Sequence, residues 1–357
     1  MSAVIAVLKR FTVQRNNNFD FIRILAALSV LVSHQFALSG LPEPRLFGVE
    51  SFGLGGLGVM TFFAISGYWV VQSWQSDPHL LRFAARRLLR IWPGLALVLL
   101  LCALVVGPWV STLSLRDYFS HPALWAYARN LVFDAVDHLP LQFVGNAMPQ
   151  AVNGSLWTLP IEIQWYALLA LLGVAGLWRF KRLWMLLSAV AALITYLVLA
   201  PLYLAQPSLF PVGINQVYAL HFGTYFLAGA TLGLLPFRAQ MRHANTALVT
   251  AWALGATALA LDQALLALWC VVPVTAVWVG TARIPFVYQA GRWGDLSFGL
   301  YIYAFPVQQV MIWQFKDRLS WGELLALCMA ITLACAWLSW HGLEKWALKL
   351  KPNRPQA

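Results

Sequence analysis

Long stretches of apolar residues alternate with short polar segments along most of the chain. Each stretch is about 20 residues long, the length of a helix that crosses the hydrocarbon core of a bilayer. The pattern predicts an all-α polytopic membrane protein with about ten transmembrane helices. The two short helices on either side of Asp262 and Gln263 are expected to form a tight hairpin. The predicted spans lie near residues 19–39, 52–74, 91–110, 155–178, 183–204, 215–235, 245–261, 265–281, 296–314 and 323–341. We expect one domain over residues 1–357, with a long external connector over 111–154.

Composition supports a membrane environment. Of the 357 residues, 61% are hydrophobic and only 10% are charged, whereas a soluble domain has about 25% charged residues. The cysteines lie in apolar runs without metal-ligand spacing, so we interpret them as small core residues rather than disulfides or ligands. They are Cys102, Cys270, Cys328 and Cys335.

The basic residues indicate an orientation. Of the 24 Lys and Arg residues, Arg23 lies within a span, five lie in connectors on one side, and the other 18 lie on the side of the N-terminus. Because cytoplasmic segments of membrane proteins carry the excess of Lys and Arg, both termini are predicted to be cytoplasmic. The net charge of +11 is therefore interpreted as a topology signal and not as a nucleic-acid site.

The first predicted span, FDFIRILAALSVLVSHQF, contains Asp20, Arg23 and His34. Arg23 and His34 are 11 residues apart, which places them within about 20° of one helix face and about 16 Å apart along the axis. A charge near mid-bilayer costs on the order of 3 kcal/mol, so we expect this polar stripe to face a hydrated cavity inside the bundle. In the alternative interpretation, Asp20 and Arg23 form an interfacial anchor and His34 is a packing residue.

An arginine cluster precedes Pro93 in LRFAARRLLRIWPG. Arg86, Arg87 and Arg90 lie within about one helical turn, and arginines at this density can hold phosphates through bidentate hydrogen bonds. The alternative is a positive anchor on the cytoplasmic side, which explains any one arginine but explains the compact set less well.

Two further motifs lie within spans. Glu162 is an intramembrane carboxylate and therefore a functional candidate, or else the structural partner of an arginine. Pro160, two residues earlier, is expected to loosen the helix. The stretch GLGGLG at 53–58 matches the dinucleotide fingerprint literally, but it opens a membrane helix, so close helix packing through small residues is favoured.

Several of these segments together resemble the acyltransferase 3 family of integral membrane proteins, which modify sugars and other hydroxyl acceptors. The resemblance extends over most of the chain, and it depends on the order and number of the motifs. The matching segments are FDFIRILAALSVLVSHQF, GVMTFFAISGYWV, RFAARRLLRIWP, NGSLWTLPIEIQWY, YFLAGATLG, LSFGLYIYAFPVQQ and LEK.

The resemblance implies a membrane O-acyltransferase, in a bacterial inner membrane, that moves an acetyl group from cytoplasmic acetyl-CoA to a carbohydrate hydroxyl. It implies His34 as the catalytic base. Glu162 or Asp20 could orient the imidazole as the third member of a triad does, and we favour Glu162 if that residue reaches the cavity and Asp20 if it does not. It also implies donor-binding arginines (Arg23, Arg86, Arg87 and Arg90). The candidate substrate-binding residues are Ser66, Trp157, Tyr166, Ser297 and Tyr301.

Imidazole, with an ordinary pKa of about 6.5, suits removal of a hydroxyl proton. Because a thioester is already activated, neither a metal nor a permanently bound cofactor is expected. We expect CoA to extend into the bundle from the cytoplasm and the acceptor to enter from the other side.

The chain departs from the family pattern at Ala304, where many relatives have a histidine, and this gives His34 more weight. No hydrolase-like domain outside the membrane is expected. Two other classes of protein stay open. A proton-coupled small-molecule transporter would use Arg23, His34 and Glu162, and a membrane sensor or scaffold would tolerate replacement of His34.

Overall fold

The computed structural model describes residues 17–44, 53–205, 214–235, 237–282, 284–285 and 287–352. Within these ranges the chain is helical, apart from connectors and one isolated bridge between His138 and Ala151. Six of the basic residues used to predict the orientation lie outside the described ranges: Lys9, Arg10, Arg15, Arg45, Arg283 and Arg354. The four cysteines are free thiols, as predicted.

Ten long helices occupy the ten stretches predicted from the sequence. They are α2 (Phe19–Leu38), α3 (Leu54–Ser76), α4 (Leu80–Leu101), α8 (Thr158–Val174), α9 (Lys181–Ala205), α10 (Ile214–Leu234), α11 (Arg242–Ala260), α12 (Ala264–Thr281), α13 (Ser297–Phe315) and α14 (Trp321–Ser339). The turn between α11 and α12 contains Asp262 in a left-handed conformation with φ of 56°, which allows the tight hairpin.

In the described part of the chain, eight segments are long and apolar enough to cross a membrane: Phe19–Leu38, Leu54–Ser76, Leu80–Val110, Gly154–Val174, Lys181–Val198, Val217–Leu234, Ala264–Thr281 and Trp321–Leu350. The other two long helices, α11 and α13, have polar residues that lower their mean hydropathy, among them Asn245 and Gln308. The protein is therefore a multi-pass membrane protein, and the apolar lengths support eight spans rather than all ten.

Helix α4 begins at Leu80, eleven residues earlier than the predicted span. The arginine segment is thus the first half of this helix and not a separate connector. The helix continues past Pro93, then through a π-helical turn (η2, Cys102–Val106) into α5 (Gly107–Val110). Because the arginines are on a continuous helix, their side chains have fixed directions relative to the bundle.

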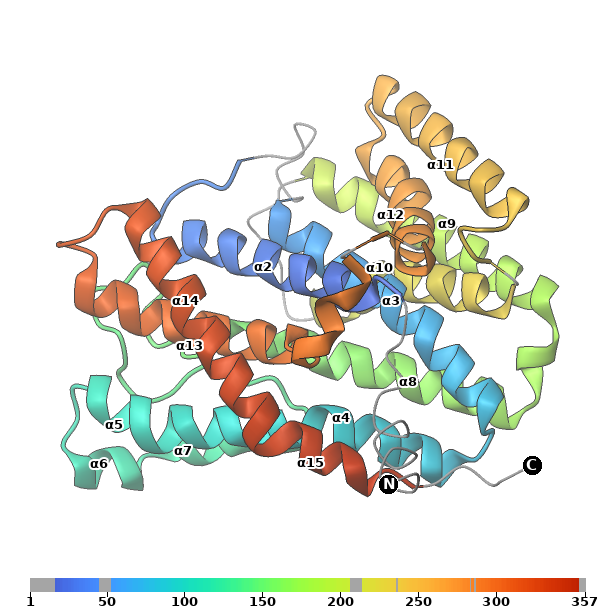
Figure 1. Ribbon diagram of the computed structural model, residues 1–357. Helices are drawn as coiled ribbons and strands as arrows, with labels where there is room; N and C mark the ends of the chain where they lie inside the picture. The colour runs from blue at the N-terminus through green and yellow to red at the C-terminus, as the bar shows by residue number, and fades with distance from the viewer. Residues whose placement is uncertain are drawn as a thin grey trace.

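Glycines bring three helices into close contact. A Cβ on Gly58 of α3 would lie 2.5 Å from the carbonyl oxygen of Ala26 on α2, and one on Gly55 would lie 2.5 Å from Ser33 Oγ. On the next interface, a Cβ on Gly229 of α10 would lie 1.9 Å from the carbonyl oxygen of Ala64 on α3. The helix-packing interpretation of GLGGLG is therefore confirmed. Helices α2 and α3 lie at the centre of the molecule, and α11 lies at the periphery beside α12 (Figure 1).

The long connector between α5 and α8 folds over one end of the bundle. It contains two short helices, α6 (Leu115–Ser120) and α7 (Pro122–Tyr127), and a 3₁₀ turn (η3, Ala128–Val132). Buried amides attach it to α13: Asn146 donates to Gln309 Oε1 at 2.8 Å, and Asn153 donates to the carbonyl oxygen of Ile302 at 2.9 Å. The segment that leads into α8 is therefore fixed against α13.

Candidate active site

A cavity of about 1020 Å³ opens among α2, α3, α4, α8, α13 and the segment after α14. Ten of the twelve residues predicted for the site line it: Asp20, Arg23, Ser66, Arg86, Arg87, Arg90, Glu162, Tyr166, Ser297 and Tyr301. Lys349 and Lys351 line it as well. We call the end of the bundle at which these arginines and lysines gather the basic end. The two predicted residues outside the lining are His34 and Trp157.

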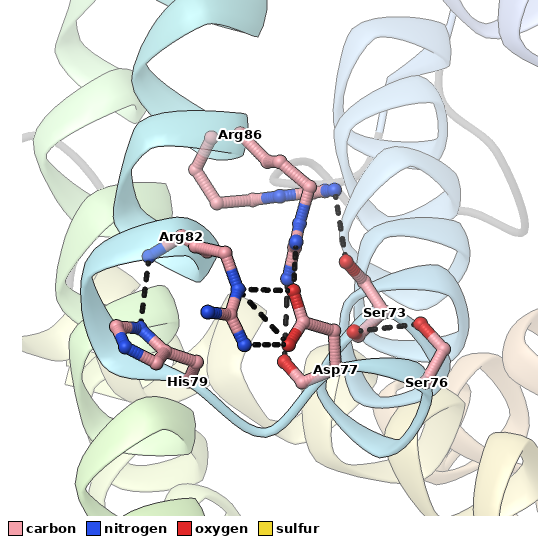
Figure 2. A network of polar contacts seen from close by, with 7 residues as sticks. Ser73, Ser76, Asp77, His79, Arg82 and Arg86 are labelled. Carbon is pink, nitrogen blue, oxygen red and sulfur yellow. Dashed lines mark hydrogen bonds and ion pairs between the residues drawn. The ribbon is translucent and has the colours of Figure 1, made fainter. Parts of the chain in front are cut away.

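At one edge of the cavity, Asp77 holds two arginines between the end of α3 and the start of α4. Arg82 donates to its carboxylate through Nε at 2.9 Å and Nη2 at 2.6 Å, and Arg86 donates through Nη1 at 2.5 Å. Figure 2 shows the Asp77 carboxylate between the two guanidinium groups. The hydrogen bonds from Arg82, opposed by burial and reinforced by Arg86, hold the pKa of Asp77 well below its ordinary value of 3.8. Arg86, predicted to bind the donor, is therefore already occupied in an internal ion pair.

Arg90 also has acidic partners. Its Nη2 atom lies 2.6 Å from Asp295 Oδ2, and its Nη1 atom lies 3.6 Å from Glu344 Oε2. Arg23 approaches the same Asp295 oxygen at 3.7 Å. Burial raises the pKa of the Asp295 carboxyl, but Arg90, Arg23, the hydrogen bond from Ser297 and Lys351 together lower it by more, so that it lies below its ordinary value. Asp295 is therefore a shared counter-ion that fixes both arginines in the cavity wall.

Arg87 differs from its neighbours. Among the residues that the structure describes, no carboxylate lies within ion-pair distance of its guanidinium group. The group donates to Ser73 Oγ at 3.5 Å and lies over the rings of Phe83 and Tyr166, each at 5.9 Å. Its charge is thus held in the cavity by aromatic faces and one hydroxyl, which leaves hydrogen-bonding capacity for an anion.

Glu162 lines the cavity from α8. It accepts hydrogen bonds from Ser66 Oγ at 3.0 Å and from the Tyr166 hydroxyl. Pro160 does not loosen the helix, because α8 begins at Thr158 and the proline falls in the first turn, where its missing N–H group would have had no partner. The carboxylate therefore reaches the cavity from a regular helix.

His34 points into the bundle but lies outside the cavity lining. Its ring contacts the Phe305 ring of α13, with 5.2 Å between centroids and 80° between planes. The expected carboxylate partners do not reach it. Asp20 is fourteen residues away on the same helix, about 21 Å along the axis, and Glu162 is bound to Ser66 and Tyr166. His34 Nδ1 has no hydrogen-bond partner among the described residues.

Trp157 is also directed away from the cavity, contrary to its predicted contact with substrate. Its ring contacts Tyr218 at 5.1 Å and Phe222 at 5.8 Å on α10. The next residue, Thr158, lines the cavity, and neighbouring residues on a helix point about 100° apart. The aromatic residue therefore packs between helices, and the threonine faces the cavity.

Three acidic residues that organise the site were not predicted from the sequence: Asp77, Asp295 and Glu344. Each lies at the end of an apolar stretch, where a lone carboxylate resembles an ordinary interfacial residue. Glu344 lies in a π-helical turn (η7, Trp340–Glu344), is 2% exposed, and accepts from Ser339 Oγ at 2.7 Å. The only available signal was position, since all three lie at the end where the arginines gather.

The sequence also shows the family to which the chain belongs. Residues 16–340 match the model of the acyltransferase 3 family, described as an acyltransferase domain, and the chain belongs to this family. The protein is therefore a membrane acyltransferase.

Two relatives extend over almost the whole chain. The O-acetyl transferase of Shigella phage Sf6 is 31% identical over 336 residues, which cover 93% of this chain and 96% of the phage protein. Nodulation protein 10 of Rhizobium leguminosarum bv. viciae is 28% identical over 370 residues, covering 94% of each chain. No solved structure matches the sequence.

Proposed function

We propose that this protein is a membrane O-acetyltransferase that transfers an acetyl group from cytoplasmic acetyl-CoA to a hydroxyl of a carbohydrate. The observation that carries the proposal is the charge of the cavity, which is lined by six cationic side chains and three carboxylates. Coenzyme A is a polyanion with several phosphate groups, and a buried guanidinium such as that of Arg87 recognises phosphate by charge-assisted hydrogen bonds. The name of the phage relative supports acetyl as the group and oxygen as its acceptor.

The direction of transfer follows from the ends of the bundle. The positive-inside bias supports a cytoplasmic position for the basic end, on the side where acyl-CoA is made. His34, on the same helix as Arg23, lies about 16 Å further along the axis, toward the opposite face. We propose that the donor enters from the cytoplasm and that the carbohydrate approaches from the other side, in a bacterial inner membrane.

His34 acts as the general base in this proposal. The imidazole takes the proton of the acceptor hydroxyl, the oxygen attacks the thioester carbonyl, and the carbon–sulfur bond breaks. The CoA thiolate leaves and takes up the proton. A positioned base of this kind contributes a rate factor of about 10²–10⁴. In this proposal the donor is bound by Glu162, Ser66 and Tyr166 on the cytoplasmic side of His34, and none of the three orients the imidazole ring.

The test uses purified protein, radiolabelled acetyl-CoA and a crude envelope-glycan mixture. Label should enter glycan with the wild type and fall to background with His34→Ala, which still binds acetyl-CoA. Release of labelled acetate without glycan labelling would indicate hydrolysis. If the wild type neither bound acetyl-CoA nor released CoA with any acceptor, the enzyme proposal would be wrong. Proton-coupled transport through Arg23, His34 and Glu162 would then be the function to measure in vesicles.

A further inference from the structure

Three side chains from three helices meet at the inner end of the cavity. Thr158 of α8 and Tyr301 of α13 share a hydrogen bond of 2.8 Å between their hydroxyl oxygens. Phe62 of α3 places its ring edge against the Tyr301 ring, with 5.7 Å between centroids and 75° between planes. All three line the cavity, and Thr158 and Tyr301 are only 5% and 8% exposed. We call these three residues the partition.

His34 lies on the far side of the partition. The start of α8 and the 3₁₀ turn before it (Gly154–Trp157) pack against α13 in successive layers. Thr158 meets Tyr301, and further out Gly154 meets Phe305, where a Cβ on the glycine would lie 2.6 Å from the phenyl ring. His34 contacts Phe305 and therefore belongs to this outer layer. One helical turn is about 5.4 Å. The proposed base and the donor cavity are thus separated by one layer of side chains.

The polar groups on the two sides of the partition differ. On the cavity side, Ser66 and Glu162 are joined by their 3.0 Å hydrogen bond. On the far side, the buried Nδ1 atom of His34 has no partner among the described residues. A thioester held by the arginines therefore meets the partition before it meets the imidazole.

We propose that Phe62, Thr158 and Tyr301 determine which acyl groups this enzyme transfers, because the acyl group must pass the partition to reach His34. This inference rests on the proposed transfer from acyl-CoA. An acetyl group passes when the Thr158–Tyr301 hydrogen bond opens and the Phe62 ring turns aside. A longer chain requires the packed rings to stay apart along its whole length, and core side chains resist that displacement. In its closed state the same layer keeps the thioester away from the His34 imidazole, so that no base activates water against it before an acceptor is bound.

Donor selectivity tests the proposal. We expect Phe62→Ala to lower the ratio of kcat/KM for acetyl-CoA over butyryl-CoA at least tenfold, and to increase acetyl-CoA hydrolysis in the absence of acceptor. Tyr301→Phe, which removes only the hydroxyl, should move both quantities in the same direction. Tyr303→Phe is the matched control on the same helix and should keep the wild-type ratio. Partition variants that transfer acetyl with an unchanged ratio would overturn the proposal.

A second measurement does not depend on activity and separates this inference from the proposed function. Ser66→Cys and His34→Cys are labelled with a charged thiol reagent added to the basic end in oriented vesicles, and the wild type gives the background of the four native cysteines. Ser66→Cys should react readily, His34→Cys should react at least tenfold more slowly, and Phe62→Ala should abolish most of that difference. Equal labelling of the two cysteines would show that no partition exists, even if the wild type proves to be an acetyltransferase. The expected labelling without any acyl transfer would leave the partition standing and refute the proposed function.

Discussion

Arg87 and Arg90 are three residues apart on one helix, but their electrostatic surroundings differ. Arg90 is neutralised by Asp295 and Glu344, at 2.6 and 3.6 Å. Arg87 lies against two aromatic rings and one serine hydroxyl. Breaking the Arg90 pairs would leave the buried Glu344 without a cationic partner and Asp295 with Arg23 alone, which is unfavourable. Arg87 is therefore the arginine whose charge is available to a ligand, and Arg90 shapes the wall.

Replacement of Arg87 by Ala should raise KM for acetyl-CoA about tenfold to hundredfold, because one charge-assisted hydrogen bond contributes about 1.5–3 kcal/mol. The value of kcat should change much less, since the guanidinium holds the part of the donor that does not react. Steady-state kinetics with saturating acceptor measures both. Arg179→Ala, which removes an arginine that lies over Trp178 outside the cavity, is the control. An unchanged KM in Arg87→Ala would show that the donor phosphates bind elsewhere.

Asp77→Asn should lower the thermal stability of the purified protein at pH 7, because Arg82 and Arg86 lose their shared counter-ion. The pKa of Asp77 is depressed in the folded state, so its ionised form stabilises the protein at every pH above the ordinary value of 3.8. The contribution disappears only as the pH falls through the depressed value. The difference in Tm between wild type and Asp77→Asn should therefore be constant from pH 7 to pH 5. A difference that already shrinks between pH 7 and pH 5 would contradict this assignment.

The ionisable residues of the site could be predicted from the sequence, but their pairing could not. Arg23, Arg87 and Glu162 are conspicuous because charges are rare in apolar stretches. Which carboxylate neutralises which arginine depends on contacts such as that between Arg90 and Asp295, which are 205 residues apart. His34 shows the same limit. Its face of the helix could be predicted, but its contact with the Phe305 ring of α13, 271 residues further along the chain, could not.

At the scale of helices, length and hydropathy located every long helix of the described residues, and the errors have local causes. The start of α4 was placed too late because arginines lower hydropathy without disfavouring a helix. The role of Pro160 was misjudged because a proline in the first turn of a helix interrupts no hydrogen bond. The close approach of α3 to α10 was not predicted, since it depends on Gly67 and Gly229 meeting backbone atoms on facing helices.

Gly229→Ala should destabilise the protein by about 1–3 kcal/mol, the usual result of overpacking. The new methyl group would lie 1.9 Å from a backbone oxygen of α3, which cannot move as a flexible side chain can. Thermal unfolding in detergent, followed by intrinsic tryptophan fluorescence, measures the effect. Gly322→Ala, in the first turn of α14 with no heavy atom within 4 Å of its added methyl group, should leave Tm unchanged or raise it. Equal Tm values for Gly229→Ala and wild type would mean that α3 and α10 are further apart than described.

At the scale of the whole molecule, the charges and the cavity define two different ends. Lys349, Lys351 and the arginines gather around the open mouth of the cavity, and the connector with α6 and α7 covers the opposite end near α13. In the proposed reaction, donor and acceptor would therefore approach His34 separately, the donor through the cavity and the acceptor from the connector side.

The orientation can be measured with one cysteine at each end. Lys181→Cys, at the start of α9, should react with an impermeant thiol reagent in inside-out vesicles and stay unlabelled in intact cells. Gly322→Cys, in the first turn of α14, should show the reverse. Both positions are exposed in the structure. Labelling of Lys181→Cys from outside intact cells would invert the proposed direction of transfer.

The position of Arg87 and the two lysines at the mouth has a consequence for the enzyme's response to the metabolic state of a cell. In the proposed reaction these groups would bind the nucleotide end of the donor, which the reaction leaves intact. Free CoA retains this nucleotide end after the acetyl group has been transferred, so it would compete with the next acetyl-CoA for the cavity. The rate of acetylation would then depend on the ratio of acetyl-CoA to free CoA rather than on the concentration of either alone. Glycan modification would slow when the cell's acetyl-CoA is depleted.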